Sequence, residues 1–240
     1  MSAPGQPRIL PCGDAALSVE FGQEIDPSLN ARVLALDARI ANAIAGVLET
    51  VPTYRSLLVY YDPAEVDFPS LSQALLDLVE ELPVSPREGR LWRIPVVYGG
   101  EFGIDLEDTA RRHGLSSAEL VRRHAAPVYR VYMNGFLPGF SYLGGLDPSI
   151  ATPRRENPRV RTPAGTISIG GAQALVTSIE APSGWHLLGR TPMRNFMLGR
   201  DPVFILEPGD RVVFEPMRPE GWDALDRAAA AGDLVAESVG

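Results

Sequence analysis

Residues 134–202 hold the side chains of this sequence whose types and spacing best suit chemistry. These 69 residues include 10 glycines, 8 prolines and seven arginines, four of which lie between Arg154 and Arg161. Glycine and proline force the backbone into turns, and the five aromatic residues among them would be absent from a flexible linker. The composition therefore indicates rigid loops on a β scaffold that together form a binding surface.

The charge of this segment is opposite in sign to that of the rest of the chain. Seven arginines against four acidic residues give it +3, so a chain of net charge −8 carries −11 elsewhere. Guanidinium groups bind carboxylates and phosphates, so we expect an anion site, unless these arginines are solvated loop charges paired with acidic residues. Nucleic acid is not an expected partner, because its recognition needs a basic domain with a long positive stripe.

A self-sufficient active site is not evident. His113, His124 and His186 are too far apart in sequence to predict a metal site, and the first two are expected to cap helices or face solvent. Cys12 is distant from every histidine, and no serine of the Gly-rich segment lies in a Gly-x-Ser-x-Gly elbow. All 22 basic residues are arginine, which excludes a lysine Schiff base and a phosphate loop ending in Gly-Lys. Backbone amides and arginines can still stabilise an oxyanion, so we expect a shared site or a binding surface.

The elements that position this segment divide into two parts. Apolar residues recur at helical spacing from Leu29 to Ile44, in a helix expected to stop near Gly46, and again over 68–82. Together with predicted strands at 8–11, 15–21 and 51–61, they indicate a small α+β domain over 1–84. Residues 85–90 are rich in helix and strand breakers and are expected to be a linker.

The remainder, 91–240, is expected to form a closed β-barrel with an acidic tail. A strand at 91–98 precedes helices at 105–113 and from Ser116 to about Ala125, the second opened by a capping-box pattern. The tail from Gly221 is predicted to form one short helix followed by a frayed end. Short β segments separated by Gly/Pro turns favour a barrel over a parallel α/β sheet, and they fall at 128–133, 166–169, 174–179, 203–206 and 211–215.

Composition limits the class of protein. With 240 residues, 45% of them apolar, the chain can build one large core or two modest ones. No apolar run approaches the ~18 residues that span a bilayer, and the N-terminal sequence lacks the pattern of a secretory signal. The single cysteine agrees with a reducing compartment. We expect a soluble, cytoplasmic protein with no membrane partner.

A series of motifs resembles a known family. After GGEFGIDLEDTA come NGFLPGFSYLGGL, ATPRRENPRVRTPAG, IGGAQ, PSGWHLLGRTP and EPGDRVVF. In this order they are similar to the B subunit of 5-oxoprolinase, also called KipI or allophanate hydrolase subunit 1, and the match starts at GDAALSVEFG near the N-terminus. The resemblance implies an α+β N-terminal domain followed by a mainly β, cyclophilin-like barrel domain.

The resemblance also implies a reaction and partners. It implies an ATP-driven opening of the lactam of 5-oxoproline to glutamate, in which phosphorylation of the carbonyl oxygen lets water attack. The implied partners are a KipA-like C subunit and a LamB/YcsF-type A subunit, with the ATP site lying mainly on a partner. The chain alone is expected to be inactive.

The resemblance assigns expected roles to individual residues of this sequence, each at a position that matches a family motif. Arg190, which lies in a constrained turn, is expected to be catalytic together with Arg154 and Arg159, which match the family's Pro-Arg pairs. His186 and Ser183 stand where the family usually has Gln and Gly, and no metal ligands are implied. The residues expected to bind substrate or partner are Phe136, Pro138, Phe140, Gly165, Gly171, Gln173, Trp185, His186 and Thr191.

Two other functions agree with the same motifs. One is a KipI-type regulatory protein that inhibits a sensor histidine kinase, and the other is one component of a urea or allophanate amidohydrolase system. Prolyl isomerase activity is not implied, because a shared barrel does not transfer function. Whichever function holds, we expect Phe136, Phe140 or Trp185 to pack at a subunit interface or its pocket.

Overall fold

The computed structural model describes residues 7–40, 43–82 and 89–239. They form two compact units, one within 1–87 and one within 88–240. Most of the linker predicted at 85–90 lies outside the described residues, so the linker and the limits of both domains stay predictions. No described helix is both long enough and apolar enough to cross a bilayer.

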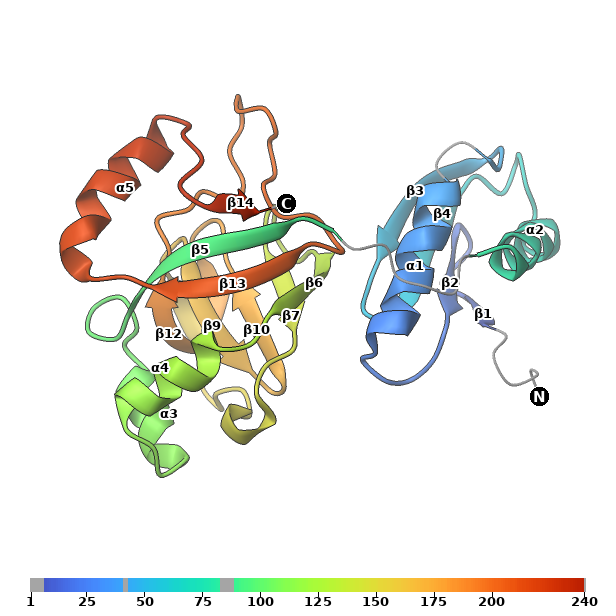
Figure 1. Cartoon of the computed structure of the whole chain (residues 1–240). Helices are drawn as coiled ribbons and strands as arrows, with labels where there is room; N and C mark the ends of the chain where they lie inside the picture. The colour runs from blue at the N-terminus through green and yellow to red at the C-terminus, as the bar shows by residue number, and fades with distance from the viewer. Residues whose placement is uncertain (1–6, 41–42, 83–88, 240) are drawn as a thin grey trace. The chain divides into compact units, whose positions relative to one another are not determined.

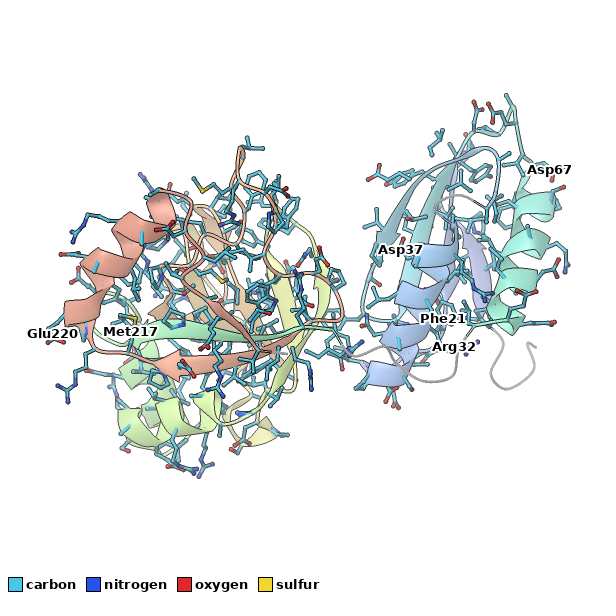
Figure 2. The ribbon with its side chains drawn as sticks, turned by 45° about the horizontal axis from the view of Figure 1, so that its top comes forward. Phe21, Arg32, Asp37, Asp67, Met217 and Glu220 are labelled. Carbon is cyan, nitrogen blue, oxygen red and sulfur yellow. The ribbon has the colours of Figure 1, made fainter. Side chains whose placement is uncertain are left out.

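The first unit is an antiparallel sheet of order β1-β2-β4-β3 with two helices against one face (Figure 1). Alternate residues of β2 and β4, such as Leu17 and Val59, are buried against the apolar stripes of α1 and α2. The Asp67 carboxylate caps α2 by accepting the Ser70 N–H at 2.8 Å, and Arg32 lies over the ring of Phe21 (Figure 2). Its elements are β1 (Arg8–Pro11), β2 (Ala16–Glu20), α1 (Pro27–Ile40), β3 (Val47–Pro52), β4 (Ser56–Tyr61) and α2 (Phe68–Glu80).

The second unit is a seven-stranded barrel of order β12-β9-β10-β7-β6-β13-β5, closed where β12 pairs with β5. The strand β14 adds to the outer edge of β5, and α3, α4 and α5 lie outside the barrel (Figure 1). The pair β5–β13 is parallel and the others are antiparallel. The elements are β5 (Leu91–Tyr98), α3 (Leu106–Arg112), α4 (Ser117–Ala125), β6 (Tyr129–Asn134), β7 (Ser141–Gly144), η1 (Pro148–Ile150), β8 (Arg159–Thr162), β9 (Thr166–Gly170), β10 (Gln173–Val176), β11 (Ala181–Ser183), β12 (His186–Arg190), β13 (Arg211–Pro216), η2 (Pro219–Gly221), α5 (Trp222–Ala230) and β14 (Glu237–Val239).

Inward-facing aliphatic residues fill the barrel, among them Ile94, Val131, Ile167 and Leu188. Closure depends on Gly189, because a Cβ at this position would come within 2.5 Å of the Val97 carbonyl oxygen. The strands β8 and β11 form a separate two-stranded sheet.

The predicted fold class is confirmed, while several elements differ from the prediction. The strand predicted over 51–61 is wrong, because Thr53 and Ser56 make a turn that divides it into the hairpin β3–β4. The strand predicted over 203–206 is also wrong, since these residues make one isolated bridge, between Phe204 and Phe196. The tail forms the expected helix, α5, but then pairs with β5 as β14 rather than fraying.

His124 lies in a buried aromatic cluster, so the prediction that it caps a helix or faces solvent is wrong. Its ring stacks on Phe214 at 5.0 Å and lies near Tyr98 and Tyr129. The hydroxyl of Tyr98 is 2.8 Å from His124 Nδ1. Burial lowers the pKa of His124 from 6.5 to about 3, because the charged imidazolium loses its hydration there.

The buried His124 should make this unit sensitive to acid. The unfolded chain binds a proton near pH 6.5 while the folded chain does not, so stability is lost as the pH falls from 6.5 towards 3. Between pH 7 and pH 5 the loss from this residue should be about 2 kcal/mol. Urea denaturation at both pH values should show a smaller loss for His124→Gln; equal losses in the two proteins would contradict the assignment.

Candidate functional site

The barrel unit carries a cleft of about 190 Å³. Its walls come from the loop between β6 and β7, the segment before β8 and the β11–β12 connection. All ten described residues that line it lie within the Gly- and Pro-rich segment, 134–202. The residues that line the cleft are Phe136, Phe140, Tyr142, Arg154, Pro158, Leu175, Pro182, Ser183, Gly184 and Trp185.

The floor of the cleft is aromatic and buried. Phe140 and Trp185 are only 2% and 5% exposed and pack with Leu175, while Tyr142 meets Trp185 edge-on at 5.9 Å. Phe136 forms the rim, 67% exposed and edge-on to Phe140 at 5.7 Å. Phe140 and Trp185 thus pack within their own chain while lining the cleft, and Phe136 is the aromatic residue that remains available to a partner.

The rim loop is strained at Phe136, which has φ 69°. A left-handed backbone costs a non-glycine residue of order 1 kcal/mol or more, and such strain is found mainly at ligand-binding sites. The loop is anchored by Asn195, which is fully buried and donates to the carbonyl of Gly139 at 2.6 Å and to Ser141 Oγ at 2.9 Å. Ser178 also donates to the carbonyl of Pro138.

The four clustered arginines have different roles. Arg155 and Arg159 both bind the carboxylate of Asp105, and Arg161 pairs with Glu180 at 2.5 Å. Among the described residues, Arg154 has no carboxylate or hydrogen-bonding partner and lies 6.0 Å from the ring centroid of Trp185. Three of the four arginines are therefore paired with acidic residues, and Arg154 is the cation that lines the cleft.

Arg154 and Tyr142 give the cleft its polar chemistry. Burial raises the pKa of Tyr142, although the charge of Arg154 opposes that rise, so at neutral pH the phenol is protonated and can donate a hydrogen bond. An apolar floor, one guanidinium and one phenol suit a small ligand that carries a carboxylate on a compact apolar body. None of the described residues that line the cleft is acidic, so these residues offer no carboxylate as general base.

Arg190 is not among the residues that line the cleft. It ends β12, where its guanidinium lies over Trp222 at 5.0 Å and Nε donates to the Ala164 carbonyl at 3.2 Å. Burial lowers its pKa, and Asp226 opposes this. Its catalytic role stays a prediction, and these contacts give it a structural role as well. The catalytic role of Arg159 also stays a prediction, and its two hydrogen bonds to Asp105 likewise give it a structural role.

The other predicted residues support the cleft or lie beside it. Gly165 (φ 72°) leaves no room for a Cβ beside the Thr191 carbonyl, and the N–H of Thr191 donates back to Gly165 at 2.8 Å. The buried His186 has a lowered pKa because of desolvation, and its Nε2 meets the Pro153 carbonyl at 2.8 Å. Gly171 is exposed and forms an isolated β-bridge with Thr152, and Gln173 begins β10.

The sequence did not single out two residues that organise the cleft, Asp105 and Asn195. Both are buried polar side chains that act through long-range contacts, with Asp105 bonded to Leu187 and Asn195 bonded to Leu206. The only signal for Asp105 was its place in the GGEFGIDLEDTA motif. In the described part of the chain, no three His, Cys, Asp or Glu side chains are grouped as metal ligands.

A protein-family model, the carboxyltransferase domain, subdomain C and D, matches residues 7–206, which include the whole cleft and every barrel strand except β13. The chain is also 39% identical to the B subunit of 5-oxoprolinase from Bacillus subtilis, over 88% of this chain and 93% of that protein. This similarity covers most of both chains. The chain therefore belongs to the family of 5-oxoprolinase B subunits.

Two solved structures of longer proteins contain a similar segment. The crystal structure of TTHA0988 matches with 36% identity and a TM-score of 0.76, over 85% of this chain but 40% of that one. The urea amidolyase of Kluyveromyces lactis matches with a TM-score of 0.81 over all of this chain and 17% of that one. At 19% identity, this second likeness shows the fold alone.

Proposed function

We propose that this chain is the B subunit of an ATP-dependent 5-oxoprolinase and that its cleft binds the substrate. The observation that carries the proposal is the 39% identity to a 5-oxoprolinase B subunit over nearly the full length of both chains. The likeness to the urea amidolyase covers 17% of that chain at 19% identity, so it supports a shared fold and does not support a urea-type substrate.

The chemistry of the cleft agrees with this substrate. 5-Oxoproline is a compact five-membered lactam that carries one carboxylate. In our proposal Arg154 binds the carboxylate, Trp185 and Phe140 contact the ring, and Tyr142 donates to an oxygen of the substrate. Phosphoryl transfer from ATP to the lactam oxygen, with release of ADP, would make that carbon electrophilic. Attack by one water with cleavage of the C–N bond would give γ-glutamyl phosphate, and hydrolysis of its acyl–phosphate bond by a second water would release glutamate and phosphate.

The remaining catalytic groups should come from partner proteins. Among the residues that the structure describes, those that line the cleft include no carboxylate and no imidazole, and the sequence lacks the lysine of a phosphate loop. We therefore propose that a KipA-like C subunit and a LamB/YcsF-type A subunit supply the base and most of the ATP site. The similarity to part of the longer TTHA0988 chain agrees with a unit that works beside further protein.

The lone chain should have no 5-oxoprolinase activity, because its cleft provides binding groups without a base or a nucleotide site. The purified chain and its mixture with both candidate partners should be assayed for glutamate and ADP, with each partner alone as a control. We expect turnover only in the complete mixture. Robust turnover by the lone chain would contradict the shared site, and inhibition of a histidine kinase without any lactam hydrolysis would favour the regulatory function.

A further inference from the structure

Asp105 lies just before α3, in a segment that contributes no residue to the cleft. Its side chain is 3% exposed, and all of its described partners belong to the segments on either side of the cleft. Burying a carboxylate is costly unless a cation and hydrogen-bond donors compensate for its lost hydration, and here the compensating groups come from both walls of the cleft.

The first set of contacts holds the wall that carries Arg154. Arg159 binds Asp105 through two nitrogens, at 2.6 Å to Oδ1 and 2.8 Å to Oδ2. Arg155, which directly follows Arg154, reaches the same Oδ1 at 3.3 Å. Two neighbours of Arg154 are therefore fixed to one buried anion, and the bidentate pair sets the direction of this wall.

The second set holds the wall that carries Trp185. The N–H of Leu187 donates to Asp105 Oδ2 at 2.8 Å, and the N–H of Asp105 donates to the carbonyl of Leu187 at 3.0 Å. The walls also meet directly, because the N–H of Arg155 donates to the Gly184 carbonyl at 2.7 Å. One carboxylate thus joins residues 155–159, which lead into β8, to the start of β12.

We infer that Asp105 is a positioning residue that holds Arg154 over Trp185 and so sets the geometry in which the cleft accepts a carboxylate. The inference about geometry stands on the contacts above, and its consequence for turnover rests on the proposed function. Without the Asp105 charge, two partly buried guanidinium groups would lose their partner, and the two walls would separate or turn.

The test compares Asp105→Asn with Asp210→Asn. Asp210 is an equally buried carboxylate that binds Arg90 and Trp92, neither of which lines the cleft. By hydrogen exchange, Asp105→Asn should lower protection in residues 153–161 and 182–187 by ~10-fold or more, while β13 keeps its protection. Asp210→Asn should leave both cleft segments unchanged.

A kinetic arm separates positioning from general stability. In the reconstituted complex, Asp105→Asn should raise the KM for 5-oxoproline about 10-fold with kcat within about threefold, whereas Asp210→Asn should change neither. Asp105→Glu, which keeps the charge, should recover part of the loss. If Asp105→Asn does not fold, Arg159→Lys takes its place. This variant keeps the positive charge but loses the planar pair of donors that binds Asp105, so it should also raise KM with kcat nearly unchanged.

Unchanged exchange in both cleft segments, or an equal loss of protection throughout the barrel, would overturn the inference. A fall in kcat with an unchanged KM would overturn it as well. An inactive wild-type complex would instead count against the proposed function, because the exchange experiment on the chain itself does not depend on turnover.

Discussion

Replacing Arg154 with Gln is expected to lower kcat/KM of the reconstituted complex for 5-oxoproline about 100-fold, or about 2.7 kcal/mol. Arg154 is the cation that lines the cleft and, within the described residues, no carboxylate neutralises it. The variant keeps a polar, hydrogen-bonding side chain, which is shorter than arginine and lacks its charge and its planar fork of donors. Steady-state kinetics should place most of the loss in KM, because the substrate carboxylate is bound in the ground state and in the transition state alike.

The matched control for this experiment is Arg161→Gln. Arg161 belongs to the same arginine cluster but is paired with Glu180 and does not line the cleft. An exposed pair of this kind contributes little, so the control should keep wild-type kinetics and stability. Equal kinetic losses in the two variants would mean that the cluster acts through its overall charge, and the assignment of Arg154 would then have to be withdrawn.

Replacing Phe140 with Ala is expected to destabilise the barrel unit by about 3 kcal/mol, because the ring is 2% exposed and packs on Trp185 and Leu175. For a unit of this size, such a loss should lower the melting temperature by about 6–12 °C. Calorimetry with urea denaturation would measure both quantities. A melting temperature within two degrees of the wild type would show that the floor of the cleft is not part of the core.

Phe136→Gly is the informative contrast on the same loop. The exposed ring contributes little to burial, and glycine removes the strain at φ 69°, which offsets its greater freedom in the unfolded chain. Stability should therefore stay within about 1 kcal/mol of the wild type, while turnover or co-purification with the partner proteins should fall. A variant with wild-type association and turnover would show that the rim takes no part in binding.

The sequence predicted much of the fold because the helices and the longer strands carry their own periodicity. The strand β5 falls at the predicted residues, and α2 begins at Phe68 as predicted. The strands that were missed, such as β7 and β12, have only four and five residues and adjoin glycines. Their pairing is decided by partners distant in sequence, as where β12 closes the barrel against Tyr98, and local patterns do not record such partners.

The candidate site was predictable by segment but not by residue. Turn residues and aromatics indicated the segment, and Phe136, Arg154 and Trp185 do line one cleft. The four clustered arginines look alike in sequence. The paired ones differ from Arg154 only through carboxylates that the fold brings to them, Asp105 for Arg155 and Arg159 and Glu180 for Arg161. Local sequence does not encode which guanidinium meets a carboxylate in the fold.

The parallel pairing of β5 with β13 also affects how the protein is made. It joins Leu91 to Arg211, so about 120 residues must leave the ribosome before β5 gains this neighbour. At ordinary rates of translation this takes roughly 6–24 s. For most of that time both edges of β5 are unpaired, because its other neighbours, β12 and β14, also lie far along the chain. Nascent chains that stall within this interval should be the ones that most need chaperones. The first unit, whose described strands pair with one another, can fold as soon as it emerges.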